Sequence, residues 1–153
     1  MAADGGHREG APGSGRLAPP APSGFLAWLD ANKQAIAHEW MERLARASER
    51  YARRPPSELR YTVFGAFRAY RQALASGSPQ GIEQFIAYIT RKRLKTGFTL
   101  TDVQSAFELF RTIVLERLLQ PDQRHLLPGA MVPLNACLTY TIQGFSDRFQ
   151  RLH

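Results

Sequence analysis

The chain has 153 residues, 44% of them hydrophobic, with nine Phe, five Tyr and two Trp, which is enough for the core of one folded domain and excludes disorder throughout. Its apolar runs reach only about five residues against the roughly 18 of a membrane span, and the amino terminus lacks the apolar segment of a secretory signal, so we expect a cytoplasmic protein without a membrane segment. The single cysteine, Cys137, excludes an internal disulfide, and its apolar neighbours predict a buried thiol. The formal net charge of +7 raises the possibility of nucleic-acid binding.

Residues 1–22 hold many Gly and Pro residues and almost no large apolar side chains. Such a segment buries too little apolar surface to offset the entropy lost on ordering. We therefore predict a disordered tail over residues 1–22, dispensable for stability, and a helical domain over residues 23–153. The prolines of the tail lack the repeated PxxP framework of a docking segment.

Two amphipathic helices are expected after the tail. The first spans residues 23–53 with Trp40 as its anchor, and the second spans residues 57–76, because Pro55-Pro56 separates them and Ser57 is a suitable N-cap. Apolar side chains recur at helical spacing in the first helix (Leu29, Ile36, Trp40, Leu44, Ala47, Tyr51) and in the second (Leu59, Val63, Ala66, Phe67, Tyr70, Leu74).

A third helix begins at Ser78-Pro79 and runs to Gly97. Its last turns hold a basic cluster of Arg91, Lys92, Arg93 and Lys95, which we interpret as cations that oppose the negative end of the helix dipole. The links on either side of this helix are short. We therefore predict that the second and third helices, and also the third and fourth, are antiparallel neighbours.

The fourth, central helix has the sharpest start signal in the chain. Thr99 is placed as the N-cap and Asp102 as its partner in a capping box, while Phe98 and Val103 have the spacing of a hydrophobic staple. The helix then carries a long apolar stripe that should face the core: Val103, Ala106, Phe107, Phe110, Ile113, Val114 and Leu118.

Pro121 ends the central helix, and an irregular connector precedes a last helix that should begin near Ala130 or Pro133. This helix carries a nearly heptad stripe: Met131, Leu134, Leu138, Ile142, Phe145, Phe149 and Leu152. Four of these residues, Leu138, Ile142, Phe145 and Phe149, are a candidate interaction face for a homodimer. The alternative is that the monomer buries the same stripe in its own core.

Together the elements predict an all-α fold, an antiparallel bundle of four long helices with a fifth at the carboxyl end. No stretch has a phosphate-binding glycine loop, metal-spaced His or Cys residues, or a nucleophile elbow. Neither His38 nor His125 is placed for haem ligation. We therefore expect no catalytic, cofactor-binding or metal-binding residue, and no enzyme.

The segment from about Phe25 to Phe149 resembles the RsbRD N-terminal domain family, the sensor-like helical module of RsbT co-antagonist proteins. The positions that carry the resemblance are Ile36, Trp40, Leu44 and Tyr51 in the first helix, then Lys95, Gly97, Phe98, Thr99, Leu100 and Val103, which match a "GFSL…V" signature, followed by Phe110 and Arg111. The resemblance implies a signalling input or dimerisation module that is joined to a STAS, kinase or helix-turn-helix output.

Two functions therefore remain open at this point. A regulatory protein-interaction module is favoured by the apolar stripe of the last helix and by the resemblance. This sequence stops at His153 without an output domain, so the module is either a stand-alone member or a domain whose output partner is another polypeptide. A small basic nucleic-acid-binding protein is favoured only by the net charge. The basic residues are spread over several helices and no recognition helix follows the cluster, so nucleic acid is the less favoured partner.

Overall fold

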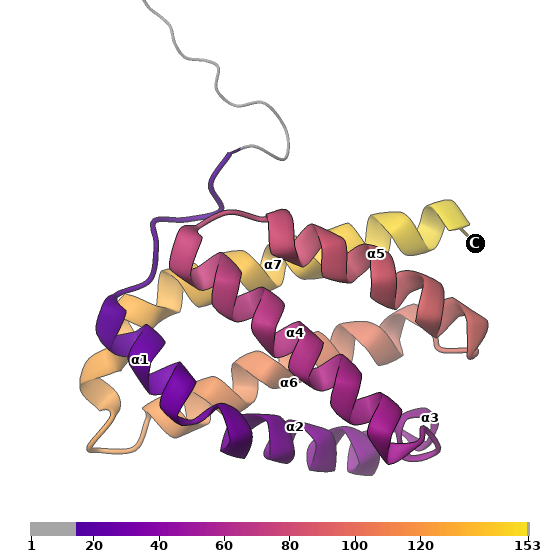
Figure 1. The fold of residues 1–153 in the computed structure, drawn as a ribbon, viewed down its shortest axis with the longest axis horizontal. Helices are drawn as coiled ribbons and strands as arrows, with labels where there is room; N and C mark the ends of the chain where they lie inside the picture. Colours follow the sequence, from indigo (N-terminus) through magenta and orange to yellow (C-terminus); the bar gives the residue numbers. More distant parts are fainter. Residues whose placement is uncertain (1–14, 153) are drawn as a thin grey trace, which may run out of the picture.

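The computed structural model of the chain describes residues 15–152, and every regular element in that range is a helix (Figure 1). The elements are α1 (Ser23–Ala31), α2 (Lys33–Ala47), α3 (Glu49–Ala52), α4 (Pro56–Ser76), α5 (Gln80–Lys95), α6 (Leu100–Leu118), a short 3-10 helix η2 (Arg124–Leu126) and α7 (Leu127–Leu152). The predicted all-α class is confirmed. Within residues 15–152, no helix has the length and apolarity needed to cross a membrane.

The single first helix predicted over residues 23–53 is divided at two polar residues. Asn32, between α1 and α2, has φ −107° and ψ 11°, and its Nδ2 donates to the Trp28 carbonyl oxygen at 2.9 Å. Ser48, between α2 and α3, is extended with φ −147° and ψ 128°. Asn and Ser favour such breaks because their side chains compete for helical backbone groups. The apolar periodicity continues through both breaks, which is why it did not reveal them.

Two other helix starts differ from the prediction. The second long helix, α4, begins at Pro56 with Pro55 as its N-cap residue, two positions before the expected cap at Ser57. The last helix, α7, begins at Leu127 and contains Pro133 in its interior, although Pro133 was a predicted start. Proline within a helix removes one backbone hydrogen bond. Pro133 is buried, so tertiary packing holds the helix together through this position.

The packing of the long helices agrees only in part with the neighbours that we predicted from the sequence. As predicted, α4 and α5 pack along each other, but α6 packs on α7 and α2 rather than on α5, and α7 also packs along α5 (Figure 1). The expected close pairing of the third and fourth helices is therefore wrong. Gly97, in the link between α5 and α6, has φ +79°, a backbone conformation that residues other than glycine rarely adopt. The left-handed residue redirects the chain so that α6 crosses to α2.

Aromatic side chains from four helices meet at the centre of the core. The ring of Phe110 on α6 lies 5.1 Å from Trp40, 5.9 Å from Phe67 and 4.8 Å from Tyr70, measured between centroids. Phe107, one turn earlier, lies 6.0 Å from Phe145 on α7. All of these rings are buried. Tilted and edge-on aromatic pairs add stabilisation beyond the burial of area, so these contacts join α2, α4 and α7 to α6.

The predicted tail is too long, because part of it packs on the domain. The backbone N–H of Leu17 donates to the Gly77 carbonyl at 2.7 Å, and that of Ala21 donates to the Leu74 carbonyl at 2.8 Å. Ala21 is buried, and a Cβ added to Gly77 would lie 2.5 Å from the Ala18 carbonyl oxygen. Residues 17–21 therefore cover the carboxyl end of α4. Residues 1–14 lie outside the described residues, and their predicted disorder stays a prediction.

Deleting residues 1–22 should consequently destabilise the domain. The deletion removes three backbone hydrogen bonds, including the one that Leu26 donates to the Pro22 carbonyl, and the burial of Ala21. Together these are worth about 2 kcal/mol, or a fall of roughly 4–8 °C in Tm for a domain of this size. Thermal unfolding followed by circular dichroism measures the change. Deletion of residues 1–14 is the matched control. An unchanged Tm for the longer deletion would show that residues 17–21 contribute nothing to stability.

Candidate functional site

The candidate interaction face on α7 is largely part of the chain's own core. Leu138 and Phe149 are buried, Phe145 is completely inaccessible, and Ile142 is partly buried against the core. The alternative interpretation of the stripe, burial within the monomer, therefore describes these residues, and they do not form a free docking face. The larger apolar side chains that α7 leaves exposed are Met131, Val132 and Leu152.

Cys137 lies on the same helix and is a buried structural thiol, as its neighbours predicted. Burial raises its pKa to about 12, so the reactive thiolate is disfavoured. Among the described residues there is no group of three or more His, Cys, Asp or Glu side chains that could hold a metal ion.

The turn between α5 and α6 has the geometry that its sequence predicted. The Thr99 hydroxyl accepts from the Asp102 backbone N–H at 3.1 Å, and the Asp102 carboxylate accepts from the Thr99 N–H at 3.0 Å. This is a complete capping box. Phe98 and Val103, the predicted staple, are both buried. The turn thus fixes the start of α6 and holds the Phe98 ring against the domain.

Arg93, predicted to be one of four surface cations at the end of α5, is instead a core residue. Only 2% of its surface is exposed, the value found for Trp40, whereas Arg91 and Lys95 on the same helix are exposed. The predicted basic cluster therefore loses its central member to the interior. A buried guanidinium requires partners, because an unpaired charge in the core is strongly destabilising.

The partners of Arg93 come from three different elements, and we call the group of Arg93, Glu58, Thr62, Tyr51 and Phe98 the Arg93 site. Nη1 donates to Glu58 Oε1 at 3.1 Å and Nη2 to Thr62 Oγ1 at 3.4 Å, both on α4. The guanidinium also lies over two rings, 4.7 Å from the Phe98 centroid and 5.3 Å from that of Tyr51. Cation–π contacts of this kind are favourable, and more so when they are desolvated. The Arg93 site therefore ties α3, α4 and α5 to the turn that begins α6.

Glu58 is held in its ionised form by its neighbours. Burial by itself would raise its pKa, but hydrogen bonds from Arg54 and Arg93 and the attraction of both charges outweigh burial, so the pKa of Glu58 lies below its ordinary value. Arg54 Nε donates to Glu58 Oε2 at 2.8 Å, on the side away from Arg93. Glu58 thus uses both carboxylate oxygens, and the carboxylate balances the Arg93 charge inside the domain.

A small cavity of about 30 Å³ adjoins the Arg93 site. Three of the predicted core residues, Trp40, Val103 and Phe107, line it together with Arg93 and Tyr51. Arg93 Nε is buried and has no hydrogen-bond partner among the described residues. A cavity of this size admits a water molecule or two, since one needs roughly 10–15 Å³ by this measure, and it is too small for an organic cofactor.

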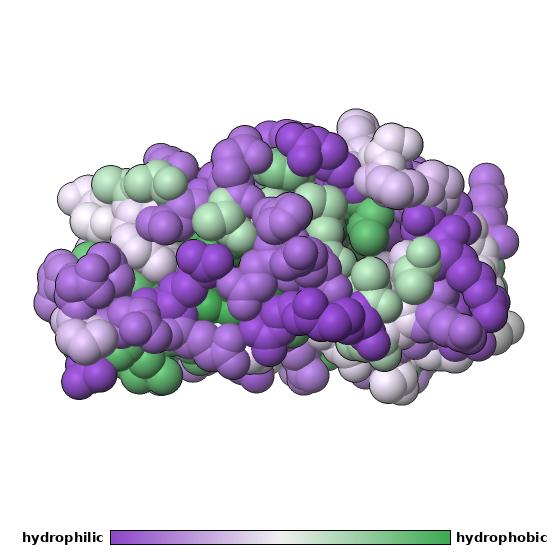
Figure 2. Space-filling model, turned by 90° about the horizontal axis from the view of Figure 1, so that it is seen from below, coloured by the Kyte–Doolittle hydropathy of each residue, from purple (hydrophilic) through white to green (hydrophobic). Residues whose placement is uncertain are grey.

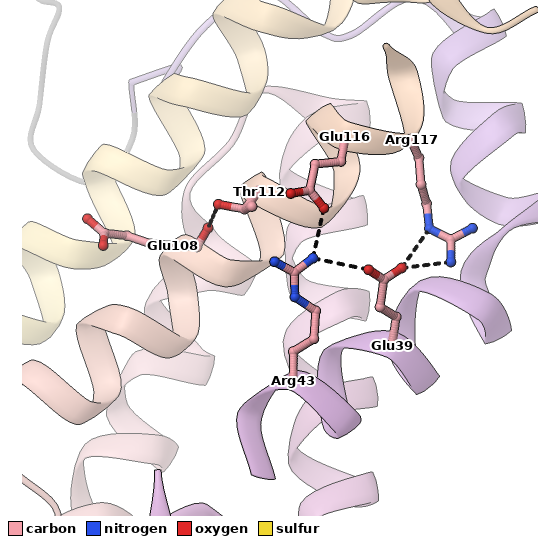
Figure 3. Close-up of polar contacts among 6 residues, drawn as sticks. All are labelled: Glu39, Arg43, Glu108, Thr112, Glu116 and Arg117. Atoms are coloured by element: carbon pink, nitrogen blue, oxygen red, sulfur yellow. Dashed lines mark hydrogen bonds and ion pairs between the residues drawn. The ribbon is translucent and has the colours of Figure 1, made fainter. Parts of the chain in front are cut away.

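A second polar group lies on the surface between α2 and α6 (Figure 3). Arg43 Nη1 bonds Glu39 Oε2 at 3.1 Å and Glu116 Oε1 at 2.8 Å, while Arg117 Nη2 bonds Glu39 Oε1 at 2.8 Å. Burial opposes the ionisation of Glu39, but the hydrogen bonds from Arg117 and Arg43 prevail and lower its pKa. Glu108 points away from this network (Figure 3). These ion pairs connect α2 to α6, and both Arg43 and Arg117 are paired within the network.

The face that includes α2, seen from below in Figure 1, is mainly hydrophilic, with apolar residues in small separate areas (Figure 2). An extended apolar docking surface is not visible on this face.

The sequence did contain a signal for the buried arginine. Arg93 follows Ile82, Ile86 and Ile89 at intervals of four, three and four residues, so it occupies the next inward position of the α5 stripe. All three isoleucines are buried. The prediction weighed the charge of the cluster above the periodicity of the helix, and the periodicity was right. The partner Glu58 lies 35 residues away, and local spacing gives no indication of that contact.

Several positions that carried the family resemblance lie around the Arg93 site. Trp40 and Val103 line the cavity, Phe98 covers Arg93, and Gly97 and Thr99 shape the turn. The family model described as "RsbT co-antagonist protein rsbRD N-terminal domain" matches residues 34–148, three quarters of the chain. The chain belongs to this family. Comparisons with curated proteins and with solved structures give no match.

Membership in the RsbRD N-terminal domain family makes the chain a regulatory signalling domain rather than a member of a known enzyme family. The matched range contains the whole Arg93 site and excludes α1 and residues 17–21. The RsbRD domain proper thus runs from α2 to near the end of α7, and the amino-terminal segment is packed onto it.

Proposed function

We propose that this RsbRD domain is a non-catalytic module of bacterial signal transduction that acts by association with itself as a homodimer or with a partner regulator. The partner would be a STAS-domain protein or a kinase, the outputs that members of this family accompany. The match of the family model over residues 34–148 is the observation that carries this proposal.

The contacts in the interior of the domain support a role in transmitting a signal between helices rather than in catalysing a reaction. The Arg93 site connects α3, α4, α5 and the turn into α6 through one guanidinium, so a change at one of these elements alters the packing of the others. A partner that binds one arrangement better than another shifts the balance between them by the difference in its affinity. Association would use surfaces other than the buried stripe on α7.

Sedimentation velocity tests the proposal. The chain is run alone over a range of concentrations, and then with each STAS-domain protein or kinase that is encoded beside it. We expect either a species of twice the 17.2 kDa monomer mass or a complex with one of these regulators. A chain that sediments as a monomer in every mixture would contradict the proposed function.

Nucleic-acid binding is the second candidate, and the net charge of +7 is the observation that favours it. Burial of Arg93 in an ion pair removes one charge from the only basic cluster, and the remaining cations lie on several helices. Binding to generic duplex DNA should therefore be weak and steeply salt-dependent, without preference for a sequence. Tight sequence-selective binding in a fluorescence-anisotropy assay at physiological salt would favour this function instead.

A further inference from the structure

A hollow of about 370 Å³ lies on the surface between α4 and α5. Its walls include the rings of Tyr61, Phe85 and Tyr88, and Gly65 lies among the lining residues where α4 crosses Phe85. Tyr61 is 66% exposed, the highest value among the exposed large apolar side chains. Its ring meets that of Tyr88 edge-on, with centroids 6.3 Å apart. The hollow thus offers aromatic surface to a ligand without rearrangement of the core.

The charged side chain in the lining of this hollow is a cation. The only charged residue in its lining is Arg68, and Lys92 Nζ lies 6.0 Å from the centroid of the Tyr88 ring. Within the described residues, neither cation takes part in an ion pair. The amides of Gln72 and Gln84, which also line the hollow, add neutral hydrogen-bond donors.

The two carboxylates of α4 and α5 are both engaged elsewhere. Glu58 bonds Arg54 and Arg93, and Glu83 accepts a hydrogen bond from the Tyr140 hydroxyl of α7. No carboxylate lines the hollow in the described part of the chain. The site therefore combines an arginine without an ion-pair partner among the described residues, amide donors and aromatic walls, and its described lining residues include no carboxylate.

We propose that the α4–α5 hollow binds an acidic segment of a partner protein, in which carboxylates meet Arg68 and Lys92 and an apolar side chain packs on Tyr61 and Tyr88. The inference rests on the proposed function, for which it names a docking surface. Charge complementarity selects the partner, because opposite charges across an interface speed association and exclude wrong partners. A nucleic-acid strand fits less well, since it requires cations repeated along a track, whereas here Arg68 lines the hollow and Lys92 lies beside its Tyr88 wall.

Fluorescence anisotropy with a labelled glutamate-rich peptide that contains one phenylalanine tests the proposal. The full chain should bind this peptide saturably, and a lysine-rich peptide of the same length should not bind. The double variant Arg68→Glu/Lys92→Glu should raise the Kd by at least about tenfold, and Tyr61→Ala should also weaken binding while the far-UV circular dichroism stays unchanged.

The matched control is Arg46→Glu/Arg151→Glu, which makes the same change of net charge at two exposed sites on α2 and α7. Its Kd should change by less than about twofold, because distant exposed charges are screened. Equal loss in the control, or no peptide binding by the wild type, would overturn the proposal. Tighter binding of an oligothymidylate than of the peptide would overturn it in favour of nucleic acid.

Sedimentation of the Arg68→Glu/Lys92→Glu variant separates this inference from the proposed function. If the variant keeps the wild type's complex with a regulator, the function stands and the docking surface is wrong. If the peptide binds in the hollow but the chain associates with neither itself nor a regulator, the hollow is an acidic-ligand site and the proposed function is wrong.

Discussion

Replacement of Trp40 by alanine should lower the free energy of unfolding by about 3–5 kcal/mol, the range for removing a large buried aromatic side chain. Trp40 is 2% exposed, packs on Phe110, and its Nε1–H donates to the Ala106 carbonyl at 3.0 Å. The substitution removes this bond and enlarges the cavity that Trp40 already lines. Phe107→Ala should act in the same way, since Phe107 lines the same cavity.

Denaturant unfolding followed by far-UV circular dichroism measures the loss. Stability of a domain is about 5–15 kcal/mol, so Trp40→Ala could leave little folded protein. Trp40→Phe provides a milder variant, with an expected cost of about 1–2 kcal/mol from the lost hydrogen bond and volume. Tyr61→Ala is the control at an exposed aromatic position and should stay within about 0.5 kcal/mol of the wild type. A Trp40→Ala midpoint equal to that of Tyr61→Ala would refute the assigned core.

Replacement of Arg93 by methionine should cost about 3 kcal/mol, near the lower end of the range for removing one member of a buried ion pair. Methionine keeps an unbranched apolar stem but ends near the position of Nε, so it loses the guanidinium contacts with Tyr51 and Phe98 and leaves the Glu58 carboxylate without its inner partner. The lower end applies because Arg54 still bonds Glu58 and 13% of the Glu58 side chain is exposed.

Arg91→Met is the matched control, since Arg91 belongs to the same helix and is exposed. Its free energy of unfolding should change by no more than about 0.5 kcal/mol. A double-mutant cycle of Arg93→Met with Glu58→Gln should give a coupling energy of about 1–3 kcal/mol. Equal effects of Arg91→Met and Arg93→Met would contradict the burial of Arg93 and would show that it is a surface cation like its neighbours in sequence.

The sequence was most informative where an interaction is local. The capping box of Thr99 and Asp102, the staple of Phe98 and Val103, and the inward faces of α4 and α6 all depend on side chains within a few residues of each other. The breaks at Asn32 and Ser48 were missed, because the apolar pattern continues across them. The packing of residues 17–21 was missed because it uses backbone hydrogen bonds, for which composition carries no signal.

For the candidate site, too, the sequence predicted the features that depend on local spacing and missed those that depend on contacts between distant segments. Trp40 and Phe107 were correctly assigned to the core from periodicity alone. The partners of Arg93 come from other helices, so charge clustering along the chain gave the wrong environment for it. Leu138 and Phe145 illustrate the reverse difficulty, since an apolar stripe has the same spacing whether a second chain or its own domain covers it.

The effect of the chain on a regulator tests most directly whether this RsbRD domain transmits a signal. The measurement is the rate at which a kinase encoded beside the chain phosphorylates its STAS-domain substrate, with and without a saturating concentration of the chain. We predict a change of at least about fivefold, which corresponds to the low end of allosteric coupling energies. An unchanged rate in the presence of a bound chain would contradict the account.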